Sequence, residues 1–226
     1  MKLLDRLNEL KDPNYKKFHA SLCPTLDEQK IIGVKVPELR TLAKELYKED
    51  NNILHEIGDY YYEEKMLRGL VIAISKVRFE EKIDLIERFV DTIDNWALCD
   101  IFCSSIKIKK SEKDKYFNFL KRYSKFKDEF KLRFLIVMLL DHYIDDDYLE
   151  ESFNIVSKIK YDAYYVKMTV AWFISIVYIK YPQYTLNKIK NLDLDKWTYN
   201  KALQKIVESK RVSEEDKEKI KKLKVK

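Results

Sequence analysis

Three side chains on otherwise apolar segments have the chemistry to stabilise a positively charged sugar. Trp96 and Asp100 are four residues apart, so on a helix they share one face about one turn from each other. An aromatic face and a carboxylate both attract positive charge, and loss of a base from deoxyribose passes through an oxocarbenium-like state. Trp172 is a second indole on a similar segment. Core packing of each tryptophan and a merely exposed or capping role for Asp100 are the alternatives.

Polar side chains also interrupt several of the apolar segments at similar positions. Asp100, Arg133, Lys167 and Lys205 are such residues, and burying them would cost desolvation unless they face a groove. For any one of them, a helix end or a private ion pair explains the position as well. Taken as a set, they predict a lined groove.

Other kinds of catalytic centre find little support. Cys99 and Cys103 are four apart and could form half a metal site, but two buried helical cysteines are the favoured interpretation. Together with Cys23 they form a sparse, odd set, typical of free thiols in a reducing cytoplasm. The three histidines show no ligand spacing, and no glycine-rich phosphate loop occurs. We therefore expect neither a metal nor an organic cofactor.

The elements that must position these residues are predicted to be helices. The 226 residues include only three glycines and four prolines, too few for the turns of a sheet protein. No apolar run is long enough for a membrane span, and the charged N-terminus lacks the apolar core of a signal peptide, so we expect a cytoplasmic protein. The net charge of +6 permits nucleic-acid binding without requiring it.

The first fifty residues are predicted to form the N-terminal helices of the domain. In its second helix, Tyr15, Phe18 and Leu22 are expected to point toward a core. The expected elements are a helix over residues 3–11, a second between Pro13 and Pro24, an extended linker at 31–36, and a third helix from Pro37 to about Tyr47.

From about residue 51 onward the chain is repetitive. Apolar helices alternate with more charged ones, and successive offsets are near 30 to 35 residues. Paired helices at this period predict an α-solenoid, in which stacked pairs share one continuous core and present a concave face. We therefore predict an all-α protein with a single repeat domain over residues 1–226. The apolar segments are 65–74, 95–102, 130–139, 165–174 and 198–207, and the charged ones are 80–89, 112–122, 147–159, 182–189 and 214–223.

Four segments, in the same order, resemble the AlkD-type DNA alkylation-repair glycosylases. Residues 93–100 are similar to the family signature in which a Trp precedes the catalytic Asp by four residues. Residues 131–138 resemble the helix with the family's Arg, and 165–172 resemble the helix with a second sugar-facing Trp. Residues 32–40 resemble the N-terminal Gly-x-x-x-Pro-x-x-Arg stretch. The resemblance spans about residues 13 to 223.

This resemblance implies a superhelix of HEAT-like repeats that releases cationic N3- and N7-alkylated purines from duplex DNA, without flipping the base into a pocket. Asp100 would be the catalytic carboxylate, and Trp96 and Trp172 would contact the lesion deoxyribose. Arg133 would hold a backbone phosphate, and Lys131, Lys167, Lys201 and Lys205 are further candidates for DNA binding. We expect a monomer that needs no cofactor.

The signature segment departs from the best-known family form at three positions, which hold Asn95, Ala97 and Leu98. These changes leave the tryptophans and the aspartate in place. Two alternatives to a glycosylase remain: a non-catalytic binder of branched or damaged DNA, and a protein-binding helical-repeat scaffold. Salt-sensitive DNA binding without an abasic product would identify the first, and absence of DNA binding at low salt the second.

Overall fold

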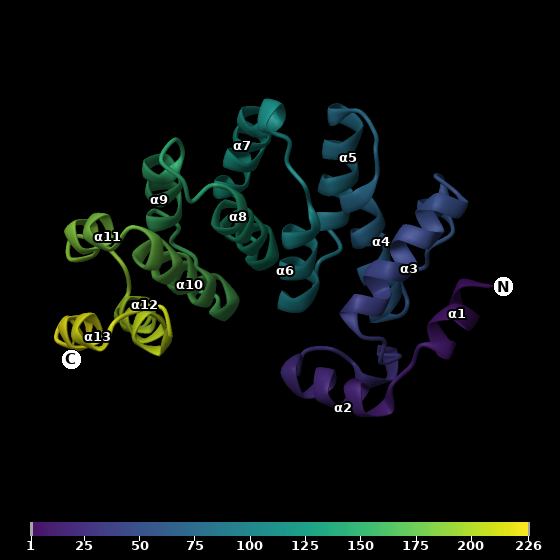
Figure 1. The fold of residues 1–226 in the computed structure, drawn as a ribbon, viewed down its shortest axis with the longest axis horizontal. Coiled ribbons are helices and arrows are strands. Elements are labelled where there is room, and N and C mark those ends of the chain that lie inside the picture. The colour runs from purple at the N-terminus through teal and green to yellow at the C-terminus, as the bar shows by residue number, and fades with distance from the viewer. Residues whose placement is uncertain (1, 226) are drawn as a thin grey trace. The chain divides into compact units, whose positions relative to one another are not determined.

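The computed structural model describes residues 2–225, and every regular element in that range is a helix (Figure 1). The all-α, helical-repeat prediction is confirmed. The contacts divide the chain into two compact units, residues 1–107 and residues 108–226, which we call unit 1 and unit 2. Each unit is described by itself, and the single-domain prediction stays a prediction.

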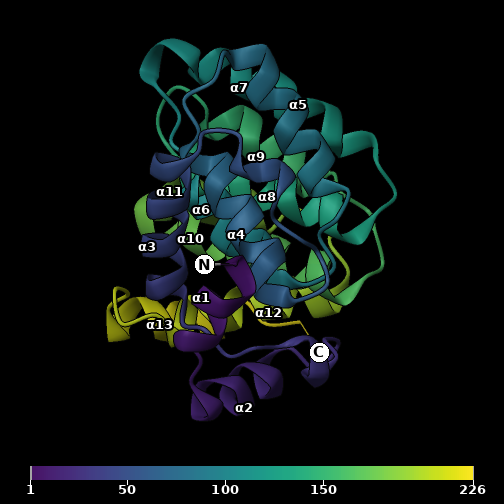
Figure 2. The same ribbon diagram turned by 90° about the vertical axis from the view of Figure 1, so that its right-hand side faces the viewer.

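Unit 1 is organised around one central helix, α4, which packs against α3, α5 and α6. Helices α2 and α5 lie at opposite ends of this unit (Figures 1 and 2). Its elements are α1 (Leu3–Glu9), α2 (Pro13–Leu22), the 3₁₀ turn η1 (Glu28–Lys30), α3 (Val36–Glu49), the 3₁₀ turn η2 (Ile53–His55), α4 (Tyr62–Ile74), α5 (Phe79–Val90) and α6 (Trp96–Ser105).

A glycine allows α4 to approach the rings of its neighbours closely. A Cβ atom at Gly69 would lie 2.6 Å from Cζ of Phe89 and 3.3 Å from Cδ2 of Phe102. Those two rings also pack against each other, with centroids 4.5 Å apart. Because any side chain at position 69 would push both rings away, this glycine sets the spacing between α4 and the helix that carries Trp96.

Unit 2 has the alternating pattern predicted from the sequence. The apolar helices α8, α10 and α12 are packed side by side in that order, and α9, α11 and α13 pack against this row (Figure 1). Its elements are the 3₁₀ turn η3 (Lys110–Glu112), α7 (Lys113–Lys121), the 3₁₀ turn η4 (Arg122–Lys125), α8 (Glu129–His142), α9 (Leu149–Ser157), α10 (Tyr164–Lys180), α11 (Pro182–Ile189), α12 (Lys196–Glu208) and α13 (Glu214–Lys221).

Polar contacts between successive repeats of unit 2 recur at the spacing that the sequence predicts. In each of them a side chain of one repeat bonds a residue 30 to 36 positions away, which is one repeat length. This regularity gives the stacked helices a fixed register beyond what apolar packing provides. The pairs are Lys113–Asp145, Lys121–Glu151, Tyr148–Asp114, Lys180–Ile144, Tyr181–Asp146, Tyr184–Glu150, Tyr165–Glu129 and Arg133–Thr169.

The predicted orientation of α2 is wrong for Phe18 and Leu22, whereas Tyr15 is half-buried as predicted. Phe18 is 58% exposed and Leu22 is 44% exposed, whereas His19 is only 5% exposed. The inward side of α2 carries Tyr15 and His19, whose rings stack with centroids 5.9 Å apart, and His19 lies 4.4 Å from the ring of Tyr62. An aromatic, partly polar side is thus buried here, which a hydrophobic pattern alone does not identify.

The cysteines are buried thiols, as expected for Cys99 and Cys103 on a helix. Within residues 2–225, no group of three or more His, Cys, Asp or Glu side chains is arranged to hold a metal ion. Over the same stretch, no helix has both the length and the apolar character needed to cross a membrane.

Candidate functional site

Trp96 and Asp100 lie one turn apart on the half-exposed side of α6. The three residues between them, Ala97, Leu98 and Cys99, are all buried. The side chain of Asn95 caps the helix by accepting a hydrogen bond from the backbone N–H of Leu98, at 2.9 Å. The helix therefore begins at Trp96, and the indole and the carboxylate share the side of α6 that solvent reaches.

The indole of Trp96 is held by the second helix of the chain. Its Nε1–H donates to the carbonyl oxygen of Leu22, at 3.2 Å, in the last turn of α2. A carbonyl at a helix end has no partner within its own helix, so this bond satisfies both groups and fixes the ring. Burial raises the pKa of the adjacent Cys23 thiol to about 11, so no thiolate nucleophile stands beside the tryptophan at neutral pH.

The linker that follows α2 is held in place by a buried carboxylate. Glu63 is 1% exposed and accepts three backbone N–H groups, from Ile32 at 2.9 Å, Gly33 at 2.7 Å and Val34 at 3.2 Å. Charge-assisted bonds to an ionised carboxylate are strong, and together they replace its lost hydration. Glu63 was not predicted as a site residue. It is one of two adjacent glutamates, Glu63 and Glu64, at the start of α4, and the sequence does not show which of the two is buried.

The N-terminal Gly-x-x-x-Pro-x-x-Arg stretch connects this linker to α6. Gly33 has φ of +102°, and a Cβ there would lie 2.7 Å from the carbonyl oxygen of Asp12. Pro37 is in the first turn of α3, where its missing N–H costs nothing. Arg40 then donates from Nη1 to Oγ of Ser105, at 2.8 Å, at the end of α6. The stretch therefore positions the helix that carries Trp96 and Asp100.

In unit 2, Arg133 is a buried cation that joins α8 to α10. It is 5% exposed, and its Nη1 donates to Oγ1 of Thr169, at 2.6 Å, and to the carbonyl oxygen of Tyr165, at 3.1 Å. The guanidinium carbon also lies 5.8 Å from the ring centroid of Tyr165. The structure thus gives Arg133 a packing role, and its predicted contact to a phosphate stays a prediction.

Trp172 lies on α10 and is half-buried, between the fully buried Ala171 and Phe173. The same helix side carries Met168 and Ile176, which are half-buried as well. This stripe follows helical spacing, so Trp172 belongs to a partly solvated apolar face of unit 2. Its predicted contact with a deoxyribose is not tested by this arrangement.

The predicted basic residues of unit 2 differ in their surroundings. The Nζ of Lys131 lies 4.7 Å from the ring centroid of Phe126. Lys167 forms an ion pair with Asp162, at 2.6 Å, and this bond raises the pKa of the lysine. Because Lys167 and Asp162 are only five residues apart, the pair is local to the start of α10. If Lys167 binds DNA in the predicted groove, it has to give up or share its ion pair with Asp162.

Lys205 shows that the cations of unit 2 crowd together. Burial lowers the pKa of this lysine, and repulsion from Lys201 and Arg133 acts in the same direction, while Glu208 opposes the shift. Lys205 is therefore close enough to Lys201 and to Arg133 to be repelled by each of them. A bound anion such as a phosphate would favour the charged form of Lys205.

One exposed aromatic residue in this region was not predicted. Trp197, in the first turn of α12, is 37% exposed, and the Nζ atoms of Lys167 and Lys201 each lie 5.5 Å from its ring centroid. The i, i+4 spacing of Trp197 and Lys201 was the available signal, since such residues share a helix face.

The fold and these side chains define a helical-repeat protein with an indole–carboxylate pair in one unit and crowded cations in the other. A family model described as DNA alkylation repair enzyme matches residues 3–206, and the chain belongs to that family. Membership supports an enzyme that acts in DNA repair, with DNA as its partner. Comparisons with curated proteins and with solved structures gave no significant match.

Proposed function

We propose that this protein is a DNA glycosylase that removes cationic N3- and N7-alkylated purines from duplex DNA. One observation carries the proposal: in a member of a DNA alkylation-repair family, Asp100 lies one turn after Trp96 on the half-exposed side of α6. The pair presents an aromatic face and a carboxylate to solvent from one rigid helix. That combination suits a sugar that acquires positive charge as its base leaves.

Release of an alkylated purine requires few catalytic groups beyond Trp96 and Asp100. An alkylated purine is already positively charged, so the bond from C1′ to the base nitrogen breaks without protonation of the leaving group. The bonding electrons go to the base, which becomes neutral, and the sugar becomes an oxocarbenium-like cation. Asp100 stabilises this cation and orients the water that adds to C1′. The proton lost by the water passes to Asp100 or to solvent.

The hydrogen bond of Trp96 supports this role by fixing the indole before substrate arrives. Its Nε1–H is engaged by the carbonyl of Leu22, so the ring keeps its π face as the surface available to a sugar. A preorganised aromatic face loses no reorganisation energy in the transition state. In the proposal Trp172 provides a second sugar contact, and no pocket has to receive a flipped base.

The cations of unit 2 supply the attraction for the phosphate backbone. Lys205 is repelled by Lys201 and by Arg133 in the protein alone, and a bound phosphate would offset that repulsion. Lys131 and Lys167 are further phosphate contacts in the proposal. Neutralising several phosphates makes the binding constant fall steeply with salt, by a slope of about 0.9 per contact on a double-logarithmic plot.

The test is time-resolved release of 7-methylguanine from a duplex by the parent, Asp100→Asn and Asp94→Asn. Asp94 is a matched control, since it belongs to the same segment but is exposed and paired with Lys65 at 2.5 Å. We expect release by the parent and by Asp94→Asn, and a loss of roughly 100- to 1,000-fold in Asp100→Asn.

Full release by Asp100→Asn would refute the proposed mechanism. If the parent binds duplex DNA in a salt-sensitive manner but releases no base, the protein is a non-catalytic binder of DNA structure. If it does not bind duplex DNA even at low salt, the helical-repeat surface serves a protein partner instead.

A further inference from the structure

Unit 2 contains an aromatic surface that the proposed base release does not use. Trp197 is 37% exposed and Tyr164 is 56% exposed, and their ring centroids lie 5.8 Å apart at an interplanar angle of 57°. The two residues come from different helices, at the first turn of α12 and the first residue of α10. Large aromatic side chains that stay in water at such proximity mark a surface for a flat ligand.

This aromatic surface is surrounded by positive charge. The ammonium groups of Lys167 and Lys201 each lie 5.5 Å from the centroid of the Trp197 ring. Lys201 donates its hydrogen bond to the neutral amide oxygen of Gln204, at 2.8 Å, so its charge is not cancelled by that contact. An open hollow of about 460 Å³ borders the indole and contains no acidic residue in its lining, which consists of Lys196, Trp197, Asn200, Lys201, Gln204 and Lys224.

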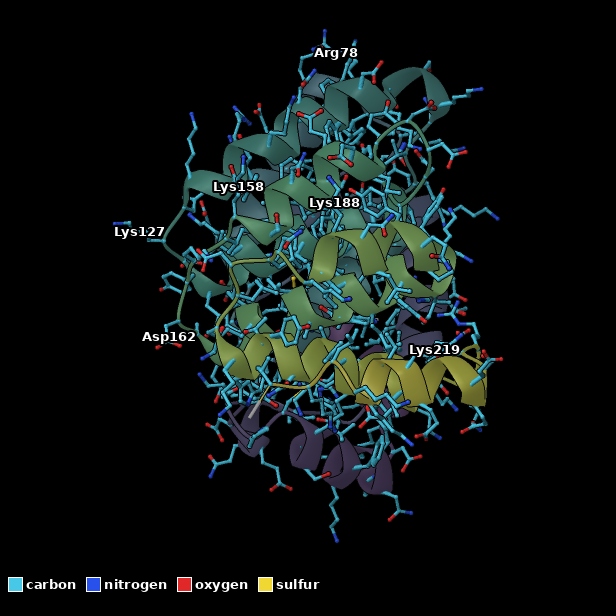
Figure 3. All side chains as sticks on the ribbon, turned by 90° about the vertical axis from the view of Figure 1, so that its left-hand side faces the viewer. Arg78, Lys127, Lys158, Asp162, Lys188 and Lys219 are labelled. Carbon is cyan, nitrogen blue, oxygen red and sulfur yellow. The ribbon has the colours of Figure 1, made fainter. Side chains whose placement is uncertain are left out.

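The nearby carboxylates are directed to other partners. Asp195 caps α12 by accepting the backbone N–H and the hydroxyl of Thr198, at 3.1 and 2.6 Å. Asp162 bonds Lys167, and Figure 3 shows it projecting from the edge of unit 2. The side of Trp197 toward Lys201 and the hollow therefore keeps a positive charge balance.

The charge and the flat aromatic surface together select one class of ligand. Cationic ligands such as methylated amines are disfavoured, because two ammonium groups already lie near the indole. Acidic peptides match the charge but offer few flat groups for stacking. A nucleotide has both an anionic phosphate and a π face, and its base face is available only when the nucleotide is unstacked from a duplex.

We propose that Trp197, Tyr164, Lys196 and Lys201, which we call the Trp197 platform, bind an unpaired nucleotide of a DNA strand. The base stacks on the indole, and Lys201 and Lys196 contact the flanking phosphates. The inference rests on the proposed function only in taking DNA as the partner, and it adds a contact to single-stranded DNA. No alkylated base is needed for this contact.

The experiment compares two probes of equal length and charge, a single-stranded decamer of thymidine and a decamer of abasic sites. Fluorescence anisotropy gives the dissociation constant of each for the parent, Trp197→Ala and Trp197→Phe. We expect the parent to prefer the thymidine strand. Trp197→Ala should bind that strand roughly 5- to 150-fold more weakly, with the abasic strand unchanged, and Trp197→Phe should keep most of the preference.

A salt titration tests the phosphate contact separately. Lys201→Ala should lower the slope of log binding constant against log salt by about 0.7, the value for one phosphate of a single strand. Equal binding of the two probes by the parent would overturn the proposal, as would unchanged binding of the thymidine strand by Trp197→Ala. Equally tight binding of a decamer of glutamate would assign the platform to acidic peptides instead.

The outcome is distinguishable from that of the base-release test, because these probes contain no lesion and the readout involves no chemistry. A parent that binds the thymidine strand through Trp197 but releases no 7-methylguanine would refute the proposed glycosylase alone. If the parent releases the base, but Trp197→Ala binds the thymidine strand as tightly as the parent does, the Trp197 platform alone is refuted.

Discussion

Each of the two units has its own kind of internal polar contact. In unit 2 the contacts repeat at 30 to 36 residues and connect equivalent positions of successive helix pairs. In unit 1 two of the contacts that hold α6 are much longer in sequence: Trp96 reaches Leu22 across 74 residues, and Arg40 reaches Ser105 across 65. The N-terminal region is thus attached to α6 by individual bonds.

The difference separates two demands on a protein that processes DNA. An extended anionic partner is attracted by charge spread over a surface, and a repetitive array of helices supplies such a surface at low structural cost. A carboxylate that stabilises a transition state must be fixed in position, and fixing it requires specific bonds to its own helix. Unit 1 has specific bonds that fix one helix, and unit 2 has charged side chains on a repetitive array of helices.

The largest change in the free energy of unfolding is expected when the hydrogen bonds of Glu63 are broken. Glu63→Gln should lower the free energy of unfolding by about 3 kcal/mol, because an amide loses the charge and turns an N–H toward the backbone donors at Ile32 to Val34. Hydrogen exchange resolved along the chain measures the effect for each unit. Exchange should accelerate in α2 and in the linker of unit 1.

Glu64→Gln is the matched control for this prediction. Its carboxylate accepts only one backbone N–H, from Tyr61 at 2.9 Å, so we expect a loss of about 1 kcal/mol. Equal losses in the two variants would show that the linker is not held by its carboxylate. Faster exchange in unit 2 would contradict the separate stabilisation of the units.

A smaller effect is expected at the bond between Trp96 and Leu22. Trp96→Phe keeps an aromatic ring but removes the Nε1–H donor, which should cost about 1 kcal/mol of stability. Base release should slow by several-fold, because the ring is less well fixed. Thermal unfolding and the 7-methylguanine assay measure the two effects. Unchanged stability would mean that the bond to Leu22 does not anchor the indole.

His19 makes unit 1 sensitive to acid. Burial lowers the pKa of this imidazole in the folded protein, and its Nε2 lacks a hydrogen-bond partner in the part of the chain that the structure describes. The unfolded chain therefore binds a proton at a higher pH than the folded one, near 6.5. Stability should be fully present above this pH and should fall as the pH drops below it, by at most about 1.4 kcal/mol per pH unit.

Denaturant titrations between pH 5 and pH 8 measure this dependence, with His19→Phe as the comparison. The variant keeps a ring between Tyr15 and Tyr62 but cannot take up a proton, so its stability should vary less over the same range. A parallel pH dependence in parent and variant would assign the acid sensitivity to other groups.

The apolar periodicity was sufficient to predict most of the fold. The alternation of apolar and charged helices from residue 62 onward, and the placement of Trp96 and Asp100 one turn apart, follow from spacings within single helices. Such spacings are local properties of a sequence. The same rule failed for α2, where Phe18 and Leu22 are exposed, because the buried side there is formed by Tyr15 and His19.

The parts of the site that could not be predicted depend on contacts between distant segments. The bond from Trp96 to Leu22 joins positions 74 residues apart, and the three bonds of Glu63 join α4 to a linker that precedes the predicted repeats. The exposure of Trp197 could not be predicted, because a tryptophan beside an apolar helix is usually buried for the most part. Its contact with Tyr164 joins α12 to α10, and sequence spacing does not reveal which side chains of two packed helices meet.

The smallest change in stability is expected at Lys205. In contrast to the substitutions in unit 1, the change at Lys205 should stabilise the protein. Its pKa is lowered by burial and by repulsion from Lys201 and Arg133, so its charge is a cost to the folded protein. Lys205→Met keeps the length of the side chain and removes that charge. We expect a gain of roughly 0.5 to 1 kcal/mol in stability, since solvent screens part of the repulsion at this half-buried position.

The same change should weaken DNA binding and lower the salt slope for a duplex by about 0.9, the value of one phosphate contact. Thermal unfolding and duplex binding at several salt concentrations measure the two effects, and Lys180→Met is the control, because that lysine bonds the Ile144 carbonyl outside the cluster. A variant that gains stability and loses DNA affinity would show that unit 2 maintains an unfavourable charge for its partner. Lower stability in Lys205→Met would mean instead that the lysine supports the fold, and the contrast between the two units would not hold at this position.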